Sequence, residues 1–508
     1  MKKLIILRRL SQTFFLFLFI YILWSTTYPL KGFISPQILF KLDPLIMLVT
    51  AMSERVLLPG LVFSLVMVVM TLILGRFFCG WVCPLGSLID FFGAWRKKKR
   101  RLPDIMNAKI RKTKYVILAI IVFFAVGGIQ GAWLLDPIVL VARVVSLNII
   151  PAFTLLIDHV FIFVIKKFEL YGPVYDVYRE LKATLLGVNV HFFVNSLITF
   201  IVFVVICGLG LWISRAWCRL LCPLGGLYAA LARFSLLQRK TENCTHCRIC
   251  HQHCRMGAIK EDGSYSQEEC ILCMDCIYDC RAGETEFSFE HEDNSQPRDR
   301  EVHSSRREFL LWLLASIPLL GFRHERKVVF NDGANVIRPP GALREDEFCN
   351  TCVRCGNCMK VCITNGLQPA MFQNGIKGLW TPRLVPEIGY CEYQCTLCGQ
   401  VCPTGAITAL AVEGKKQAKL GVARIDRSLC IAWADNKQCI VCEEHCPVAD
   451  KAIKVKEEVV HGRKVYKPFV DESLCIGCGI CQNKCPVRPV RAIQVDPAQA
   501  NRVTTLHS

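Results

Sequence analysis

The sequence predicts a multidomain protein with an all-α, membrane-spanning first part and small α+β domains built around cysteines in its second part. Two observations predict this division. Long apolar runs fill residues 1–240, whereas 25 of the 30 cysteines lie in residues 241–508. A chain of 508 residues that is 53% hydrophobic is too apolar for a disordered protein and too long for a single secreted disulfide scaffold.

The first part predicts an all-α transmembrane domain of four or five helices. A helix needs about 20 apolar residues to cross a bilayer, and four runs approach that length: Ser11–Leu30, Leu57–Leu74, Tyr115–Leu135 and Val190–Ile213. A fifth run, Phe153–Ile165, is shorter, and we expect an interfacial or buried helix there. Basic residues at the N-terminus and in the loop Arg96–Arg101 predict that both are cytoplasmic, because basic loops stay inside.

A duplication is visible in this part. The string GRFFCGWVCPLGSLIDFF, starting at Gly75, recurs as SRAWCRLLCPLGGLYAAL, starting at Ser214, and a Leu-Asp-Pro precedes each copy. The copies predict two C-x3-C-P pairs at the cytoplasmic ends of helices, formed by Cys79, Cys83, Cys218 and Cys222. Sulfurs four residues apart share one helix face, so two facing pairs can supply a metal site or two dithiol centres. Free thiols in a structural motif are the alternative.

Six groups of four cysteines follow, most of them with C-x2-C-x2-C-x3-C spacing. A tight loop of this kind presents three thiolates to one cubane, and the fourth cysteine ligates the neighbouring cluster. The spacing predicts six 4Fe-4S clusters in ferredoxin-like α+β domains rather than zinc ribbons or disulfides. The groups are Cys244, Cys247, Cys250 and Cys254; Cys270, Cys273, Cys276 and Cys280; Cys352, Cys355, Cys358 and Cys362; Cys391, Cys395, Cys398 and Cys402; Cys430, Cys439, Cys442 and Cys446; and Cys475, Cys478, Cys481 and Cys485.

The spacing predicts how the first two groups combine but not the last four. The short gap between the first two predicts that Cys280 completes the first cluster and Cys254 the second. The gaps among the last four are nearly equal, so the third group can pair with the fourth or with the sixth. Cys207 and Cys349 remain without assignment. The haem-like string from Cys247 to His251 would take ligands from a complete group, so we reject it.

The chain order predicts five segments: a transmembrane domain (1–240), a two-cluster ferredoxin domain (241–285), a linker (286–303), an apolar segment (304–322) and a four-cluster ferredoxin-like domain (323–508). The string Ser305-Arg306-Arg307-Glu308-Phe309-Leu310 resembles a twin-arginine export signal. Its apolar core spans about 21 Å as a helix, short for a span. We expect residues 323–508 to be extracytoplasmic, with a cytoplasmic location behind an interfacial helix as the alternative.

These motifs carry a family resemblance. Residues 1–285 resemble NapH, the membrane quinol dehydrogenase subunit of periplasmic nitrate reductase systems, and more distantly the membrane parts of NosR and of the assembly ferredoxin CcoG. Residues 304–500 resemble the ferredoxins NapG and MauM, so the chain resembles a NapH-NapG fusion. The resemblance implies a multi-pass protein of the bacterial inner membrane that passes electrons from quinol to an extracytoplasmic oxidoreductase or cytochrome. The CcoG likeness implies the alternatives, a metal or cofactor reductase, an assembly factor or a relay subunit.

Quinol fits the sequence as the electron donor, because the chain has no G-x-G-x-x-G dinucleotide fingerprint. Ionisable groups within apolar segments are costly and therefore candidates for the quinol site: Asp136, Arg143, His159 and His191. Each can instead be an interfacial side chain, and either histidine can ligate haem. The net charge of +19 does not require nucleic acid, because basic membrane loops and six clusters, which would lower it to about +7, account for it. The expected partners are lipid and the quinone pool.

Overall fold

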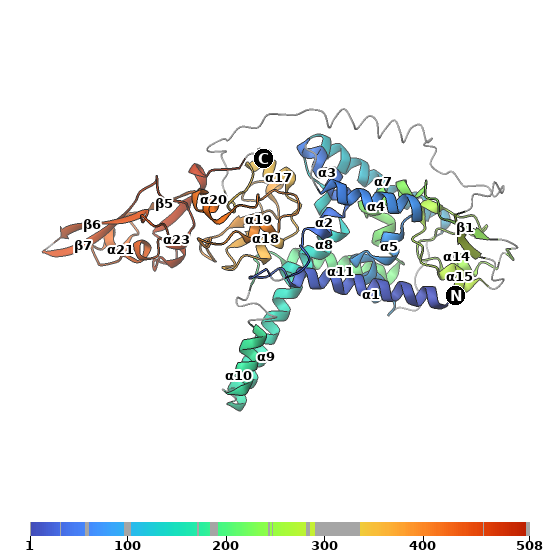
Figure 1. The fold of residues 1–508 in the computed structure, drawn as a ribbon, viewed down its shortest axis with the longest axis horizontal. Helices are drawn as coiled ribbons and strands as arrows, with labels where there is room; N and C mark the ends of the chain where they lie inside the picture. The colour runs from blue at the N-terminus through green and yellow to red at the C-terminus, as the bar shows by residue number, and fades with distance from the viewer. Residues whose placement is uncertain are drawn as a thin grey trace. The chain divides into compact units, whose positions relative to one another are not determined.

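The computed structural model describes residues 2–30, 32–55, 60–95, 103–169, 172–182, 191–241, 244–245, 247–280, 285–289, 336–460 and 462–503 (Figure 1). The chain forms two compact units. Unit 1 comprises Met1–Leu23, Gln37–Val144 and Ile198–Arg323, and unit 2 comprises Trp24–Pro36, Val145–Leu197 and His324–Ser508. The predicted twin-arginine-like segment 304–322 lies outside the described residues, as does most of the predicted linker.

Unit 1 is built from helices around a buried helix, α13 (Pro223–Ala232), which packs against α3, α4 and α7. Apolar side chains of α3 such as Leu45 and Met47 are fully buried in its core. The outer faces are apolar too: Phe17 of α1 and Val62 of α4 are each 67% exposed. Helices that are apolar all round suit a lipid environment better than water. The helices are α1 (Lys2–Trp24), α2 (Ile38–Lys41), α3 (Pro44–Glu54), α4 (Leu61–Leu74), α7 (Asp104–Val126), α8 (Pro137–Val144) and α11 (Leu197–Trp212).

Two helices are long and apolar enough to cross a membrane, Lys3–Trp24 and Pro137–Phe168. The first overlaps a predicted span. The second does not: α8, the π-helical segment η2 (Val145–Ile149) and α9 (Ile150–Phe168) follow one another without a break, whereas we expected only a short helix at Phe153–Ile165. Polar residues such as Arg143 and Asn148 interrupt the apolar run in sequence but not the helix. The apolar helices α4 and α11, at two other predicted spans, are shorter than a full span.

The two copies of the duplicated string form the same elements. In the first, α5 (Phe77–Trp81) leads through Cys83 into α6 (Pro84–Gly93); in the second, α12 (Ala216–Leu220) leads through Cys222 into α13. Proline is favoured at the first position of a helix, because its missing N–H would have no partner there. The sequence C-P therefore ends one helix at the cysteine and starts the next.

Unit 1 also contains the first ferredoxin part. Strand β1 (Gln238–Thr241) pairs with β2 (Thr285–Ser288) in antiparallel fashion, with Gln238 opposite Ser288. Between them lie α14 (Ile249–His253), η4 (Gln267–Glu269) and α15 (Asp275–Asp279), and the two short helices pack on each other. The strands close a two-helix domain, the α+β arrangement predicted for these cysteine groups.

Unit 2 contains the second ferredoxin part, in which short helices follow the cysteine loops and two-stranded sheets close the domains. Antiparallel pairs form between β3 and β4, β5 and β8, and β6 and β7. The strands are β3 (Leu367–Pro369), β4 (Pro382–Leu384), β5 (Val422–Ile425), β6 (Ile453–Val460), β7 (Arg463–Val470) and β8 (Ile493–Asp496). The helices are α17 (Glu345–Thr351), α18 (Asn357–Lys360), η6 (Ile376–Gly378), α19 (Leu397–Gln400), α20 (Val412–Gln417), α21 (Ile431–Ala434), α22 (Val441–Glu444), α23 (Ile480–Lys484) and η7 (Pro497–Gln499).

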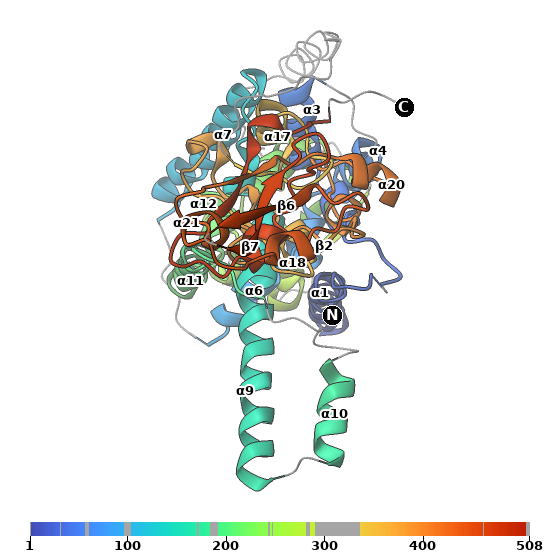
Figure 2. The same cartoon turned by 90° about the vertical axis from the view of Figure 1, so that its left-hand side faces the viewer.

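A helical hairpin in unit 2 pairs α9 with α10 (Pro173–Leu181), which lie side by side in Figure 2. Asp158 of α9 accepts hydrogen bonds from the Tyr178 hydroxyl at 2.9 Å and from Lys182 Nζ at 2.8 Å. The rings of Phe161 and Tyr178 stack with their centroids 5.4 Å apart. These contacts explain how a carboxylate is tolerated on the apolar α9, where it is 6% exposed.

Candidate metal centres

The cysteines of the first ferredoxin part gather into two sets. Cys244, Cys247, Cys250 and Cys280 line one cavity. Cys254 lies close enough to Cys270, Cys273 and Cys276 to interact with them electrostatically. Each set thus takes three cysteines from one loop and the fourth from the other loop, the exchange predicted from the short gap.

Four cavities in unit 2 are each lined by four cysteines. These sets are Cys352, Cys355, Cys358 and Cys402; Cys362, Cys391, Cys395 and Cys398; Cys430, Cys439, Cys442 and Cys485; and Cys446, Cys475, Cys478 and Cys481. The third group in sequence therefore exchanges its last cysteine with the fourth, and the fifth with the sixth. The pairing that equal gaps left open is consecutive in this structure.

The backbone of the loops is shaped to present sulfur. Arg248, Met274 and Arg354 have φ values of 59°, 62° and 53°, and Gly356 has φ 89°, so the chain turns sharply between neighbouring cysteines. Backbone N–H groups then point at sulfur atoms: Ala258 N lies 3.2 Å from Cys254 Sγ and Ala423 N lies 3.3 Å from Cys475 Sγ. Such hydrogen bonds stabilise negative charge on a ligated thiolate.

The buried thiols of these sets are suited to binding iron. Burial raises the pKa of Cys358 and Cys398 well above that of a free thiol, and neighbouring cysteines raise it further. Bound iron would replace the protons, since metals bind the thiolate. Arg354, 4% exposed, lies beside Cys352, and burial lowers its own pKa to about 10. A positive charge placed there offsets part of the charge of a thiolate-ligated cluster.

Each of these ferredoxin sets has four thiols, the number of protein ligands that a 4Fe-4S cluster takes. Within the ranges that the structure describes, no three His, Cys, Asp or Glu side chains are arranged to hold one metal ion.

The four cysteines of the C-x3-C-P copies also come together. Cys79, Cys83, Cys218 and Cys222 are between 4% and 7% exposed, and each lies close enough to others of the four to interact electrostatically. The backbone N–H of Gly225 lies 3.2 Å from Cys222 Sγ. This is the convergence that facing pairs predicted.

The four candidate quinol-site residues are divided between the two units. Asp136 and Arg143 lie close together in unit 1, where the Arg143 guanidinium also lies 5.3 Å from the Trp133 ring. His159 is exposed on α9, with Nδ1 2.9 Å from the carbonyl oxygen of Leu155. His191 Nε2 lies 2.8 Å from the carbonyl oxygen of Cys362 in unit 2. Each of these histidines therefore has one ring nitrogen beside a backbone carbonyl oxygen.

Asp43 is a partner of Asp136 that sequence reasoning missed. Each carboxyl group caps its own helix through Oδ1: Asp43 accepts from Leu45 N at 2.9 Å, and Asp136 from Ile138 N at 2.8 Å. The two side chains are within hydrogen-bonding reach of each other, and both are fully buried. The repeated Leu-Asp-Pro was the signal that could have paired them.

The two unassigned cysteines, Cys207 and Cys349, are both buried in the fold. Cys349 Sγ lies 3.3 Å from Glu345 Oε1, apart from the four sulfurs of the neighbouring cavity. Cys207 is 8% exposed in α11. Free cysteines are often packed as small apolar side chains.

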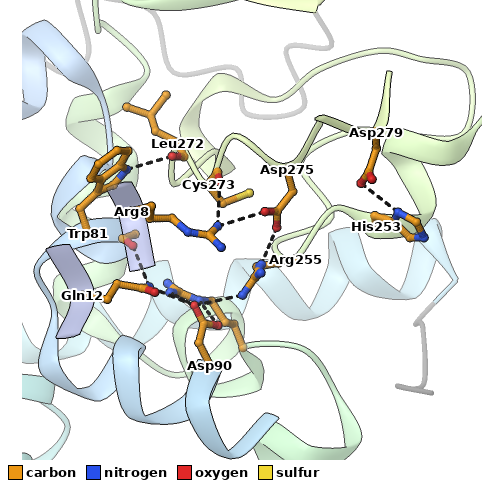
Figure 3. Close-up of polar contacts among 12 residues, drawn as sticks. Arg8, Gln12, Trp81, Asp90, His253, Arg255, Leu272, Cys273, Asp275 and Asp279 are labelled. Carbon is orange, nitrogen blue, oxygen red and sulfur yellow. Dashed lines mark hydrogen bonds and ion pairs between the residues drawn. The ribbon is translucent and has the colours of Figure 1, made fainter. Parts of the chain in front are cut away.

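The helix α1 is held against the second cysteine loop of unit 1 (Figure 3). Arg8 Nη1 donates to the carbonyl oxygen of Cys273 at 2.7 Å and lies 3.3 Å from Asp275 Oδ1. Arg255 joins Asp275 to Asp90 with N–O distances of 2.5 and 3.3 Å. The helix, the loop and the first C-x3-C-P copy therefore share one network of charges.

Comparisons with known proteins agree with these centres. A family model described as a 4Fe-4S binding domain matches residues 56–103, 195–243 and 398–420, and a second model with that description matches 468–491. The NosR model matches residues 242–283. No solved structure matches the chain. The first model covers both C-x3-C-P pairs, and the second covers the last cysteine group.

Curated relatives point to the same class. The methylamine utilization ferredoxin-type protein MauM of Methylorubrum extorquens is 35% identical over 169 residues, which are 33% of this chain and 74% of that protein. The ferredoxin-type protein NapG of Escherichia coli is 34% identical over 168 residues, 32% of this chain and 70% of that protein. An uncharacterized protein of Methanocaldococcus jannaschii is 27% identical over 301 residues, 57% of this chain and 98% of that protein.

The fold and its cysteine sets define an iron–sulfur electron-transfer protein with 4Fe-4S clusters of the ferredoxin type. The chain belongs to the family of ferredoxin-type proteins that includes MauM and NapG.

Proposed function

We propose that this protein is a membrane-bound component that oxidises menaquinol or ubiquinol and passes the electrons through six 4Fe-4S clusters to an extracytoplasmic redox enzyme or cytochrome. One observation carries the proposal: α1, long and apolar enough to span a membrane, bonds directly to a cluster loop through Arg8 and the carbonyl oxygen of Cys273. A lipid-soluble donor beside such a helix is also beside an electron acceptor. The clusters, when bound, supply one-electron transfer steps.

A membrane part of four or five spans belongs to the proposal. The outward apolar side chains of α1, α4 and α11 support it, with Phe14, Val66 and Val205 each more than half exposed. Large exposed apolar surfaces are unusual in soluble proteins and mark contact with lipid or with another protein. The duplicated strings and the NapH-like order of the segments are consistent with the same membrane part.

Opposite sides of the membrane for the two ferredoxin parts also belong to the proposal. The basic N-terminus and the basic loop Arg96–Arg101 support a cytoplasmic first part. The string Ser305-Arg306-Arg307-Glu308-Phe309-Leu310, which resembles a twin-arginine export signal, supports an extracytoplasmic second part.

The Asp43–Asp136 pair is the proposed proton acceptor. Oxidation of a quinol to a quinone releases two protons with two electrons. Two buried carboxyl groups that face each other do not both carry a charge, so the pair holds one proton. It can therefore accept one quinol proton with the first electron transfer and must pass that proton on to water before it accepts the second. Arg143 lies close to Asp136. The backbone N–H groups at the starts of α3 and α8 fix both side chains in place.

The proposal is tested by anaerobic reduction of the full-length protein with a menaquinol analogue. We expect the visible absorbance of the oxidised clusters to bleach and EPR signals of reduced clusters to appear. Dithionite provides the control for cluster integrity. If dithionite reduces the clusters but quinol does not, the protein is a relay that receives its electrons from another protein, and the proposal is wrong.

A further inference from the structure

The four cysteines of the C-x3-C-P copies lie among buried polar groups that lack a partner. The hydroxyl of Tyr228, fully buried, has no hydrogen-bond partner among the described residues. It lies close enough to Cys79 and Cys83, and to the Asp43–Asp136 pair, to interact with them electrostatically. Arg76 Nε and Nη2 are likewise buried without a bonded partner in that part of the chain. Orphaned donors around four converging thiols point to an anionic group between them.

Two arginines tie the copies together reciprocally. Arg76 and Arg215 each stand three residues before the first cysteine of their own copy, but each guanidinium lies against the other copy. Arg215 Nη1 donates to the carbonyl oxygen of Cys79 at 2.5 Å and lies 3.4 Å from where a Cβ on Gly86 would be. Arg76 Nη2 lies 3.1 Å from the corresponding position on Gly225. Both arginines are at most 1% exposed.

These guanidiniums place positive charge beside the thiols. Each interacts electrostatically with Cys79 and Cys218, one cysteine from each copy. Their carboxylate partners, Glu269 and Asp90, are shared with further cations, Lys114 and Arg255. Burying so many cations is costly unless negative charge is nearby. A group held by four thiolates and carrying about −2 provides it.

Four converging thiols match the number of protein ligands that a 4Fe-4S cluster takes. All four thiols are free, with no disulfide between them. The site also differs from a ferredoxin set, since its ligands come from two repeated helix–turn–helix elements.

The site lies directly against a ferredoxin loop. A Cβ added to Gly80 would lie 2.1 Å from the carbonyl oxygen of Ile271. Trp81 Nε1 donates to the carbonyl oxygen of Leu272 at 2.9 Å. The two contacting residues, Gly80 and Ile271, directly follow Cys79 and Cys270 in the sequence.

We propose that Cys79, Cys83, Cys218 and Cys222 together hold one further iron–sulfur cluster, shared between the two copies, which passes electrons to the cluster held by Cys254, Cys270, Cys273 and Cys276. In each transfer the shared cluster loses one electron and the ferredoxin cluster gains it; no bond forms or breaks. Arg76 and Arg215 are positioning residues that hold the charge of the shared cluster. The presence of this cluster does not depend on the identity of the electron donor. The donor is quinol in the proposed function, whereas the test uses dithionite.

The test is iron and sulfide analysis with Mössbauer and EPR spectroscopy on the anaerobic full-length protein. We expect the double variant Cys79→Ser, Cys218→Ser to lose about four iron and four sulfide per chain and one spectroscopic centre. The matched control, Cys207→Ser, changes a buried thiol of the same unit and should lose neither. Unchanged iron in the double variant, or loss of one zinc instead, would overturn the proposal.

Two further measurements do not require that the double variant folds. Pulsed EPR on the wild-type protein reduced with dithionite should show magnetic coupling between the signal of the Cys270 cluster and one additional centre; its absence contradicts the shared cluster. Arg76→Gln and Arg215→Gln should shift the midpoint potential of the additional centre to more negative values, and Arg76→Lys should restore part of the shift. An unchanged potential in both Gln variants would show that the arginines only support the fold.

Discussion

Gly80 lies so close to Ile271 that a Cβ on the glycine would be 2.1 Å from the isoleucine carbonyl oxygen. The close approach joins the first C-x3-C-P copy to the loop of Cys270 and Cys273. A side chain at position 80 must push the two backbones apart. The contact therefore sets both the stability of this junction and the length of the electron path across it.

We expect Gly80→Ala to destabilise the junction by about 1–3 kcal/mol, the usual cost of overpacking, and to slow reduction of the Cys270 cluster. Rapid-freeze EPR after mixing with reductant measures that rate. Gly208→Ala is the matched control, because a Cβ on Gly208 of α11 meets no atom within 4 Å. Equal rates in both variants would show that the contact is not on the electron path.

The exchange of cysteines in unit 2 makes a prediction about single variants. Cys402 lines the cavity of Cys352, Cys355 and Cys358, although it follows Cys398 in sequence. Cys402→Ser should therefore alter the spectrum of the same cluster as Cys355→Ser. Cys398→Ser, four residues earlier, should alter a different cluster. Mössbauer spectra of the three variants distinguish this pairing from one in which Cys402 belongs with Cys398.

Glu269 is the buried carboxylate that holds two cations of unit 1. Its oxygens lie 2.6 Å from Lys114 Nζ and 3.0 Å from Arg76 Nη1. Removing one partner of a buried ion pair costs about 3–5 kcal/mol, because the other charge stays buried. Glu269→Gln should lower the temperature at which the first ferredoxin part loses its clusters. Glu261→Gln, at an exposed ion pair with Arg248, is the control and should change it little.

The same residue predicts a dependence on pH. Burial alone would raise the pKa of Glu269, but Lys114 and then Arg76 outweigh it and hold the pKa below its usual value. A carboxyl group of this kind stabilises the folded protein fully above its unfolded pKa of about 4.3. The contribution is lost as the pH falls through the lower folded value. Thermal melting followed from pH 7 down to about pH 2, through this window, should show a smaller acid destabilisation in Glu269→Gln than in the wild type.

The carboxyl pair predicts a specific defect in quinol oxidation. Asparagine keeps the oxygen that caps each helix, so Asp43→Asn and Asp136→Asn should fold normally. We expect both variants to be reduced more slowly by quinol, because the pair can no longer exchange its proton. Reduction by dithionite should be unchanged. Wild-type rates with quinol in both variants would remove the pair from the proton path.

The cysteine sets show how far sequence can lead. The spacing of Cys244 to Cys280 predicts both the loops and the exchange, because the short gap between the two groups is typical of a two-cluster ferredoxin. The nearly equal gaps after Cys362 do not predict how the last four groups pair, because the length of a connecting segment does not show which cysteine loops lie side by side. The short sheets decide it: β5 pairs with β8, across the fifth and sixth groups, whereas β3 and β4 lie between the third and fourth.

The buried polar residues were harder to predict. Arg76 and Arg215 occupy the same position in the duplicated strings, but a sequence does not show that each guanidinium reaches the other copy. In the same way, the sequence does not show that the side chains of Asp43 and Asp136 face each other. The helix Pro137–Phe168 escaped prediction because Arg143 and Asn148 divide its apolar run, and burial in the fold accommodates Arg143.

Electron transfer from quinol to the far side of a sealed membrane tests the central claim most directly. Spheroplasts that contain the protein are given a reduced quinol analogue and a membrane-impermeant one-electron acceptor outside. The account predicts reduction of the external acceptor that depends on quinol and is lost in Cys478→Ser, a ligand of the last cluster set. Acceptor reduction only after the membrane is opened would place the last clusters in the cytoplasm and contradict the account.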